Sequence, residues 1–428
     1  MCTFNLLDHI RNHEEQSVVV WLFNIGVEKY WSNDISSVKS GNDEIIVNHM
    51  EEMNLLITRK QDYMIMRKKP DEAYLQQLAE KGYQIPNFLF PEEEYETRSI
   101  SELVLRDEKL LNRLKQLGNE NVYFAPYGVS SLEEEIADKC GLVLVGGPSK
   151  SAQQINNKIF AREVSEKLGF TCTNGQVCDS VEQVKVVSEE LLRSNKKIVI
   201  KYPTGASGKG LWVVDNIEKL STILLVIRRI CEKKGIEEQF IVEEWCEKNF
   251  DLNYQIYVGM DGKVEVFSIK EQLLNETVYV GSLLPPRLPK ELYAQCIKCG
   301  NKIGELMYSQ GYNGVLGVDA MITKDGVFIP IIEINARFTL STYTSFLSFG
   351  DENKYMLSFY RRIPLNTKDD YLIISNRLKN DFCKEEGFCY VSETVKEETV
   401  GKYGRMFVVV YAGSIERVLK LHADISTM

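Results

Sequence analysis

Hydrophobic positions in the first third of the chain alternate between short strand-like runs and helical periodicities. Residues 17–24 form an apolar run that is typical of a buried strand, and residues 141–147 form another. Between them, Ser130 and Glu133 have the spacing of a capping box that opens a helix, and Gly141 is a suitable helix stop. This alternation predicts a small parallel-sheet βα domain over residues 1–148.

The pattern changes twice after residue 148. Helical periodicity covers residues 151–168, 181–194 and 216–234, and two β-branched runs lie at 198–200 and 211–214. From residue 239 strand-like runs dominate, apart from a helical pattern over 290–310. Asp261-Gly262 and Asp325-Gly326 predict tight hairpin turns in this part. We therefore expect an α/β and α+β fold with three further units, at 149–238, 239–350 and, as a C-terminal α/β extension, 351–428.

The segment Lys201–Gly210, with the sequence K-Y-P-T-G-A-S-G-K-G, lies between the two β-branched runs of the second unit. This order predicts a β-hairpin whose loop is rich in glycine. Glycines allow backbone N–H groups to turn toward an anion, and the two lysines of the segment add positive charge. The glycine spacing differs from that of a P-loop and from that of a Rossmann loop. The segment therefore indicates a different kind of loop for nucleotide phosphates, although by itself it would also suit a solvated hairpin.

Composition narrows the classes of function. The chain has 428 residues, of which 44% are apolar and 26% charged, as expected for a globular protein of two or three packed domains. The net charge of −10 argues against a nucleic-acid partner. No apolar run is long enough to cross a bilayer, and the charged N-terminus differs from a signal peptide. We therefore expect a cytoplasmic protein without a membrane partner.

Histidines are scarce, and this scarcity limits the chemistry. The chain has four, and none lies between residues 50 and 421. Catalysis by a Ser-His or Cys-His pair near the glycine loop is therefore disfavoured. Chemistry based on phosphates, lysine, arginine and a metal ion is favoured instead.

Other polar residues fit a nucleotide site around this loop. Lys158 precedes the loop in a helical pattern, and Glu243-Glu244-Trp245-Cys246 ends a strand whose polar groups could meet an adenine and a ribose. Asp319 lies in the predicted strand over residues 313–323. Glu333, Asn335 and Arg337 lie in the next predicted strand, over residues 327–337, and share one of its faces because side chains alternate along a strand. Carboxylate and amide oxygens suit Mg²⁺, and arginine suits a phosphoryl group or an oxyanion. Each residue alone would also suit an ordinary surface position.

In this order the residues resemble the ATP-grasp superfamily over roughly residues 150–345. The resemblance implies ATP and Mg²⁺ as cofactors, with ATP held between two α+β subdomains under a glycine-loop lid. It implies an acyl phosphate that a nucleophile attacks, with Lys201 and Arg337 as catalytic residues. The residues implied to contact the nucleotide are Lys158, Lys201, Gly205, Ser207, Gly208, Lys209, Gly210, Glu243, Glu244, Trp245 and Cys246, and those implied to bind the metal are Asp319, Glu333 and Asn335.

The N-terminal third resembles the pre-ATP-grasp domain of secondary-metabolite ligases, through Trp31-Ser32-Asn33-Asp34 and the βα layout. These include the butirosin-type ligase that attaches glutamate to an acyl carrier protein and the pheganomycin-type peptide ligase. The resemblance implies an ADP-forming ligase of antibiotic biosynthesis that loads an amino acid such as glutamate onto a carrier-protein thiol. An amide-forming ligase for a small amine or peptide is the alternative, followed by a small-molecule kinase and a non-catalytic nucleotide-binding protein.

Docking of an acidic carrier protein requires a local basic patch on this acidic chain. Two clusters are candidates, Arg67-Lys68-Lys69 and Arg361-Arg362. Either cluster would also be typical of a solvated surface.

Overall fold

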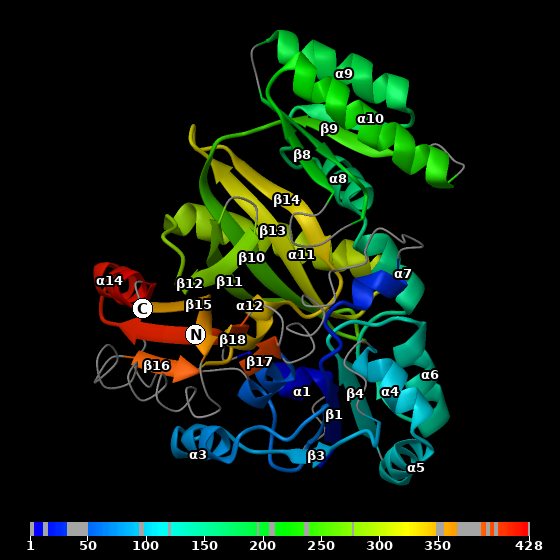
Figure 1. Cartoon of the computed structure of the whole chain (residues 1–428), viewed down its shortest axis with the longest axis vertical. Coiled ribbons are helices and arrows are strands. Elements are labelled where there is room, and N and C mark those ends of the chain that lie inside the picture. The colour runs from blue at the N-terminus through cyan, green and yellow to red at the C-terminus, as the bar shows by residue number, and fades with distance from the viewer. Residues whose placement is uncertain are drawn as a thin grey trace.

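The structure is a computed structural model, and three sheets follow one another along its long axis (Figure 1). It describes residues 4–11, 16–31, 50–93, 98–118, 121–194, 197–204, 210–234, 239–275, 278–347, 355–365, 387–390, 394–397 and 401–426. Within these ranges, no helix has the length and apolar character needed to cross a membrane.

The N-terminal sheet has five parallel strands in the order β3-β2-β1-β4-β5. Its central strands are almost entirely buried, which explains why they read as continuous apolar runs without alternation. The predicted parallel-sheet βα arrangement is confirmed. The strands are β1 (Val18–Leu22), β2 (Tyr63–Ile65), β3 (Asn87–Leu89), β4 (Val122–Pro126) and β5 (Val143–Leu144), and the helices are α1 (Leu6–Ile10), η1 (Val27–Tyr30), η3 (Glu51–Leu56), α3 (Glu72–Glu80), α4 (Ile100–Arg106), α5 (Glu108–Leu117) and α6 (Ser131–Cys140).

The predicted capping box opens α6. Ser130 is its N-cap, and the Glu133 carboxylate accepts the backbone N–H of Ser130 at 2.7 Å. Gly141 ends the helix with a φ of 67°, a left-handed conformation that favours glycine. The local sequence therefore determines both ends of this helix.

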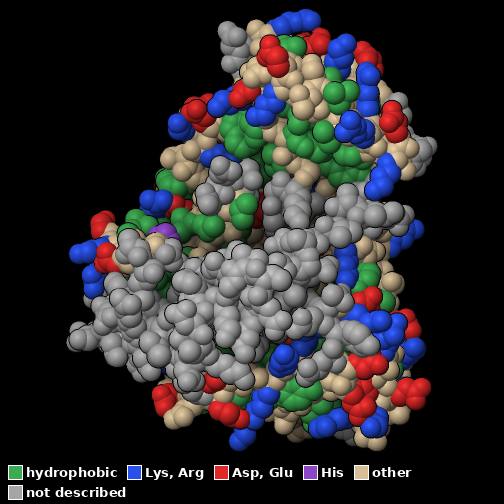
Figure 2. All heavy atoms as spheres, viewed as in Figure 1, with side chains coloured by type: hydrophobic (Ala, Val, Ile, Leu, Met, Phe, Trp, Pro, Cys, Tyr) green, Lys and Arg blue, Asp and Glu red, His purple; other side chains and the backbone are tan. Residues whose placement is uncertain are grey.

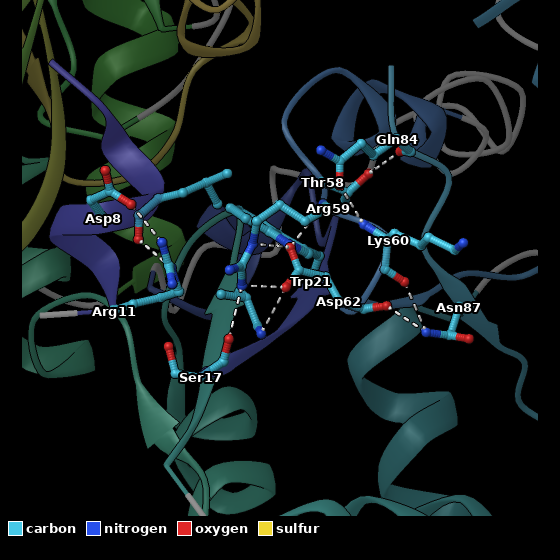
Figure 3. Close-up of polar contacts among 12 residues, drawn as sticks. Asp8, Arg11, Ser17, Trp21, Thr58, Arg59, Lys60, Asp62, Gln84 and Asn87 are labelled. Carbon is cyan, nitrogen blue, oxygen red and sulfur yellow. Dashed lines mark hydrogen bonds and ion pairs between the residues drawn. The ribbon is translucent and has the colours of Figure 1, made fainter. Parts of the chain in front are cut away.

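A buried carboxylate connects the first two strands of this sheet (Figure 3). Asp62 is 0% exposed and accepts hydrogen bonds from Val19 N at 3.1 Å and Trp21 Nε1 at 3.3 Å. Arg59 forms an ion pair with Asp62 at 2.6 Å and also donates to Ser17 O at 3.0 Å. Because the buried charge has an opposite charge and several donors, its burial is compensated. These bonds hold the start of β2 beside β1.

The middle of the chain forms a four-stranded antiparallel sheet in the order β6-β9-β7-β8. Helices α9 and α10 pack together above it, at the top of Figure 1. This sheet has its own hydrophobic cluster, separate from the core of the rest of the molecule. The elements are α7 (Ser149–Ile155), α8 (Lys158–Lys167), β6 (Gly175–Cys178), α9 (Val181–Arg193), β7 (Ile198–Lys201), β8 (Leu211–Val214), α10 (Ile217–Lys234) and β9 (Phe240–Glu244).

One helix expected here is in fact two. The expected helix over 151–168 is interrupted between α7 and α8, because Asn157 leaves the helical conformation and its side chain accepts the N–H of Ile159 as an N-cap. As a result Lys158 is the first residue of α8 rather than a residue in the middle of a longer helix.

The largest sheet is antiparallel and has nine strands, in the order β14-β13-β10-β11-β12-β15-β18-β16 with β17 beside β18. Both predicted hairpin turns are present, and Gly262 and Gly326 have positive φ angles of 81° and 83°. The elements are β10 (Lys248–Val258), β11 (Val264–Asn275), β12 (Val278–Leu284), α11 (Lys290–Ser309), β13 (Gly314–Thr323), β14 (Phe328–Asn335), α12 (Leu340–Thr344), β15 (Tyr355–Leu365), β16 (Gly387–Tyr390), β17 (Thr394–Glu397), β18 (Gly401–Ala412) and α14 (Ile415–Ser426).

Two of these sheets extend across the boundaries of the expected units. Strand β9 lies just after residue 238 but pairs with β6 and β7 of the middle sheet, and β15 extends the largest sheet beyond residue 350. The boundaries at residues 148, 238 and 350 remain predictions. The N-terminal sheet and the largest sheet share one continuous core. The four-stranded part is therefore the part best suited to move relative to the others.

Candidate active site

Helix α11 covers one face of the largest sheet, and the polar residues of interest are on the other face. Gly300 and Gly304 of α11 lie against Tyr254 and Val264 of the sheet. Side chains alternate along a strand, so Asn253 and Gln255 of β10 face away from α11. Figure 2 shows the molecule hollowed between the part that contains α9 and α10 and the larger body below it. The candidate residues lie around the join between these parts.

A buried cluster of opposite charges lies where the four-stranded sheet meets α8. The Lys201 Nζ, at the end of β7, is 2.5 Å from Glu243 Oε2 on β9. Arg162 of α8 is 2.9 Å from Glu243 Oε1. Burial alone would raise the pKa of the Glu243 carboxyl, but Lys201 and Arg162 together lower it below its ordinary value. Glu243 is therefore a fixed negative charge that orients both cations.

These three residues line a small pocket with Lys158. Its walls also include Cys172, Thr173 and Ile331. Lys158 is 8% exposed, and its Nζ is 3.5 Å from Glu333 Oε1 on β14. The backbone N–H of Lys158 donates to Pro203 O at 2.9 Å, which links the start of α8 to the chain leaving β7. Two of the three predicted nucleotide lysines, Lys158 and Lys201, thus lie on the walls of one pocket, between the four-stranded part and the largest sheet.

Strand β9 ends at Glu244, within the predicted segment Glu243-Glu244-Trp245-Cys246, and two backbone N–H groups of this segment are engaged inside the fold. Trp245 N donates to Lys197 O at 2.7 Å, and Glu244 N donates to Asn174 O at 2.8 Å. Cys246 is half-buried, and burial raises the pKa of its thiol. Contact of these residues with an adenine or a ribose remains a prediction.

The glycine loop is described only at its ends. Gly205, Ser207, Gly208 and Lys209 lie outside the described residues. Gly210 has a φ of 75°, and its carbonyl accepts the N–H of Tyr202 at 2.7 Å. The expected hairpin is confirmed, because β7 and β8 are antiparallel neighbours.

The two predicted metal-binding carboxylates are directly opposite each other on adjacent strands. Asp319 of β13 pairs with Glu333 of β14, and β13 is irregular just after Asp319. Burial, followed by the negative charge of Glu333, raises the pKa of Asp319 to about 6. Asn335, which is buried, lies two residues after Glu333 and is opposite Gly317. Repulsion between two adjacent acids favours a cation between them.

This donor set fits Mg²⁺ better than a metal held by protein alone. In the described part of the chain, no group of three or more His, Cys, Asp or Glu side chains could hold a metal ion. Mg²⁺ commonly uses one or two protein carboxylates and takes its other ligands from phosphates and water. Asp319, Glu333 and Asn335 provide such a partial set.

Arg337 is close to the carboxylates, but it is not on their strand. Strand β14 ends at Asn335, so the expectation that Arg337 shares a strand face with Glu333 is wrong. The chain bends at Arg337, where Phe338 N donates to Tyr127 O at 2.8 Å. The guanidinium still interacts electrostatically with Glu333 and Asp319. A long-range contact with the N-terminal domain, rather than strand periodicity, therefore positions it.

The N-terminal domain holds two of the three guanidinium nitrogens of Arg337. Its Nε is 2.8 Å from Glu28 Oε1, and its Nη1 donates to Tyr127 Oη and Phe338 O at 3.0 Å each. The guanidinium also stacks on the Tyr127 ring at 5.3 Å. Among the described residues Nη2 donates no hydrogen bond, so it is the atom of Arg337 best placed to meet a substrate anion.

Sequence reasoning missed Arg162, Glu28 and Tyr127. Arg162 follows Lys158 by one helical turn and so shares its face, a spacing that could have indicated it. Glu28 and Tyr127 have no local signal, because they are about 300 and 200 residues from Arg337 and meet it only in the fold.

Comparison with known families agrees with this geometry. The sequence matches the ATP-grasp domain over residues 155–341 and the pre-ATP-grasp domain over residues 50–142. The chain therefore contains a pre-ATP-grasp domain followed by an ATP-grasp domain, the domain type of ligases that use ATP and Mg²⁺.

Particular relatives agree with this class. The chain is 27% identical, over 97% of its length and 94% of the relative's, to the [butirosin acyl-carrier protein]–L-glutamate ligase of Niallia circulans. It is 24% identical, over 45% of its length and 64% of the relative's, to the tyramine–L-glutamate ligase of Methanocaldococcus jannaschii. Among solved structures, an N5-carboxyaminoimidazole ribonucleotide synthetase in complex with ADP has a TM-score of 0.56 at 15% identity and covers 96% of this chain and 95% of its own. At that identity the last comparison shows the fold alone.

Proposed function

We propose that this protein is an ADP-forming carboxylate ligase that works through an acyl phosphate. The observation that carries the proposal is the pair of opposed carboxylates, Asp319 and Glu333, with Lys158 beside Glu333 and Arg337 near both. Cations and a metal-binding acid pair at one point suit the transfer of a phosphoryl group from ATP to a substrate carboxylate.

Each residue has a defined part in this scheme. Lys158 and Lys201 bind the phosphates of ATP and offset the repulsion between them and the substrate carboxylate. Asp319, Glu333 and Asn335 hold Mg²⁺, which supplies charge neutralisation on the phosphates when bound. The carboxylate oxygen attacks the γ-phosphorus and ADP leaves. A thiol or amine then attacks the acyl carbon and phosphate leaves, while Arg337 Nη2 donates to the oxyanion.

The substrate proposal rests on relatives rather than on geometry. Similarity to the butirosin ligase extends over nearly the whole chain, so we propose that the donor is an amino acid such as glutamate and the acceptor a carrier-protein thiol, in antibiotic or other secondary-metabolite biosynthesis. The tyramine–L-glutamate ligase favours a second candidate, amide formation with a small amine. The two candidates share the first step and differ in the nucleophile.

Of the first basic cluster proposed for carrier docking, Arg67-Lys68-Lys69, only the two lysines are exposed. The Arg67 side chain is 9% exposed, near Glu51 at 3.3 Å, and donates to Arg98 O at 2.5 Å, so it is occupied within the N-terminal domain. Lys68 and Lys69 are exposed, and Lys69 is next to Glu72. The side chains of Arg361 and Arg362 lie outside the described residues.

The decisive experiment measures products from ATP, Mg²⁺ and L-glutamate, with hydroxylamine as a trap. We expect ADP, and glutamyl hydroxamate only when hydroxylamine is present, because only an activated acyl group gives a hydroxamate. Phosphorylated substrate without hydroxamate would indicate a kinase, and pyrophosphate as the stoichiometric product would rule out the mechanism. Nucleotide binding without turnover on any amino acid tested would indicate a non-catalytic protein.

A second measurement separates the two acceptors. The intact mass of a phosphopantetheinylated carrier protein, after incubation with enzyme, ATP and glutamate, should increase by one glutamyl group. No gain on any carrier tried, together with efficient amide formation with tyramine or another amine, would favour the amide ligase.

A further inference from the structure

The side-chain amides of Asn253 and Gln272 hold the carboxylate of Asp319. Asn253 Nδ2 donates to Asp319 Oδ1 at 2.8 Å, and Gln272 Nε2 donates to the same oxygen at 3.0 Å. Both donors lie on strands of the same sheet, and Asn253 is the direct cross-strand partner of Asp319. Within the described residues the other oxygen, Oδ2, has no hydrogen bond. One oxygen is thus fixed, and the other is left for a ligand.

The contact continues away from Asp319 as a chain of hydrogen bonds. Asn253 Oδ1 accepts from Gln255 Nε2 at 2.5 Å, which determines the orientation of the Asn253 amide, since its Nδ2 must then face Asp319. Gln255 Nε2 also donates to Thr339 Oγ1 at 3.0 Å, and Thr342 Oγ1 donates to Gln255 Oε1 at 2.5 Å. Asn253 and Gln255 are 1% and 0% exposed. The chain therefore connects Asp319 to the start of α12.

Two other features keep α12 in place over these amides. Lys270 is fully buried, and its Nζ donates to Ser341 O and, at 2.8 Å each, to the hydroxyls of Thr344 and Ser345. Gly317 lies beneath the junction, where a Cβ would be 2.5 Å from Thr339 Cγ2 and 3.1 Å from Gln255 Nε2. A side chain at residue 317 would therefore push Thr339 and Gln255 apart.

From this geometry we infer that Asn253 is a positioning residue for metal binding by Asp319, and that Gln255 and α12 in turn fix Asn253. The inference rests on the proposed function, in which Asp319 binds Mg²⁺. Amide donors on one carboxylate oxygen restrict the rotation of the group and direct the other oxygen toward the metal. Outer-shell partners of this kind typically contribute about 10- to 100-fold to metal affinity.

The test measures metal binding directly and needs no knowledge of the acyl substrate. Mn²⁺ replaces Mg²⁺ as the probe, with the full-length protein in complex with ADP, and water proton relaxation reports protein-bound Mn²⁺. We expect Asn253→Ala to weaken Mn²⁺ binding about 10- to 100-fold. Gln255→Ala should weaken it less, because Gln255 acts through Asn253. Asn87→Ala is the control, since it loses two hydrogen bonds to the carbonyls of Lys60 and Asp62, far from this site (Figure 3).

Two further variants distinguish a failure of this inference from a failure of the proposed function. Asp319→Asn should abolish Mn²⁺ binding, and if it does not, the metal assignment of the proposed function fails and the inference fails with it. If Asp319→Asn abolishes binding while Asn253→Ala remains within twofold of wild type, the inference alone is overturned. Gly317→Ala removes no donor but disturbs the contact between Gln255 and Thr339. If Asn253→Ala does not fold, weakened binding in Gly317→Ala supports the inference and unchanged binding overturns it.

Discussion

Replacing Asp319 by asparagine should make the metal-free protein more stable while destroying metal binding. Asp319 pairs with Glu333 across two strands, and burial together with this second acid raises its pKa from 3.8 to about 6. A difference of about two pH units corresponds to about 3 kcal/mol by which the ionised carboxylate destabilises the native state. Asparagine has nearly the same shape, and its oxygen can still accept from Asn253 and Gln272, but it cannot ionise.

The pH dependence of this effect has a definite sign. Because the pKa in the folded state exceeds that in the unfolded state, the stability associated with protonated Asp319 is fully present below about pH 4. It is lost as the pH rises to about 6. The stability advantage of Asp319→Asn over wild type should therefore grow between these pH values and reach about 3 kcal/mol above them. With ADP present throughout, adding Mg²⁺ should stabilise wild type and leave the variant unchanged, which narrows the difference in stability.

Hydrogen exchange of peptides covering β13 and β14 is the appropriate assay, because it reports local stability even if the domains unfold separately. Wild type and variant are compared at equal pH in a chelator, so the intrinsic dependence of exchange on pH cancels. At pH 7.5 the backbone amides of β13 and β14 should exchange roughly a hundredfold more slowly in Asp319→Asn than in wild type, because a factor of this size corresponds to about 3 kcal/mol. Asp251→Asn is the matched control, because this carboxylate on β10 pairs with Lys248 at 2.6 Å and its loss should bring no gain. A variant less protected than wild type at pH 7.5 would refute the electrostatic reasoning.

The remaining predictions concern turnover and the lid. Lys201→Ala should raise the ATP concentration needed and slow ADP release by roughly 10²–10³, because one preorganised charge is lost; an unchanged rate would contradict its role. Glu333→Gln should keep the fold by circular dichroism but lose most ADP production, and near-normal production at saturating Mg²⁺ would exclude it as a ligand. Glu28→Ala should leave ATP affinity unchanged but slow turnover by on the order of 10²-fold, since Arg337 loses the partner of its Nε; a change in ATP affinity alone would count against this. Hydrogen exchange in residues 204–210 should slow when ATP and Mg²⁺ are added, as expected of a lid, and equal exchange would argue against one.

Local signals in the sequence were sufficient wherever neighbouring residues determine the conformation. The capping box at Ser130, the glycine turns at Gly262 and Gly326, and the hairpin around the glycine loop are all present as predicted. Ordered motifs spaced along the chain also indicated the ATP-grasp family. Signals of this kind depend on backbone conformation and on residue chemistry, and a linear sequence records both directly.

Contacts between distant segments were decided only by the tertiary structure. Strand periodicity placed Arg337 beside Glu333 on β14, yet the strand ends earlier and Glu28 with Tyr127 hold the arginine. Likewise, Asp319 was recognised as an acid in a strand, but the amide of Asn253 that orients it comes from a strand more than 60 residues away. A sequence pattern fixes which face of a strand a side chain occupies, but the partner across the sheet depends on strand order and register. Those are set by packing of the whole core, and so the supporting residues of this site became visible only once the chain was folded.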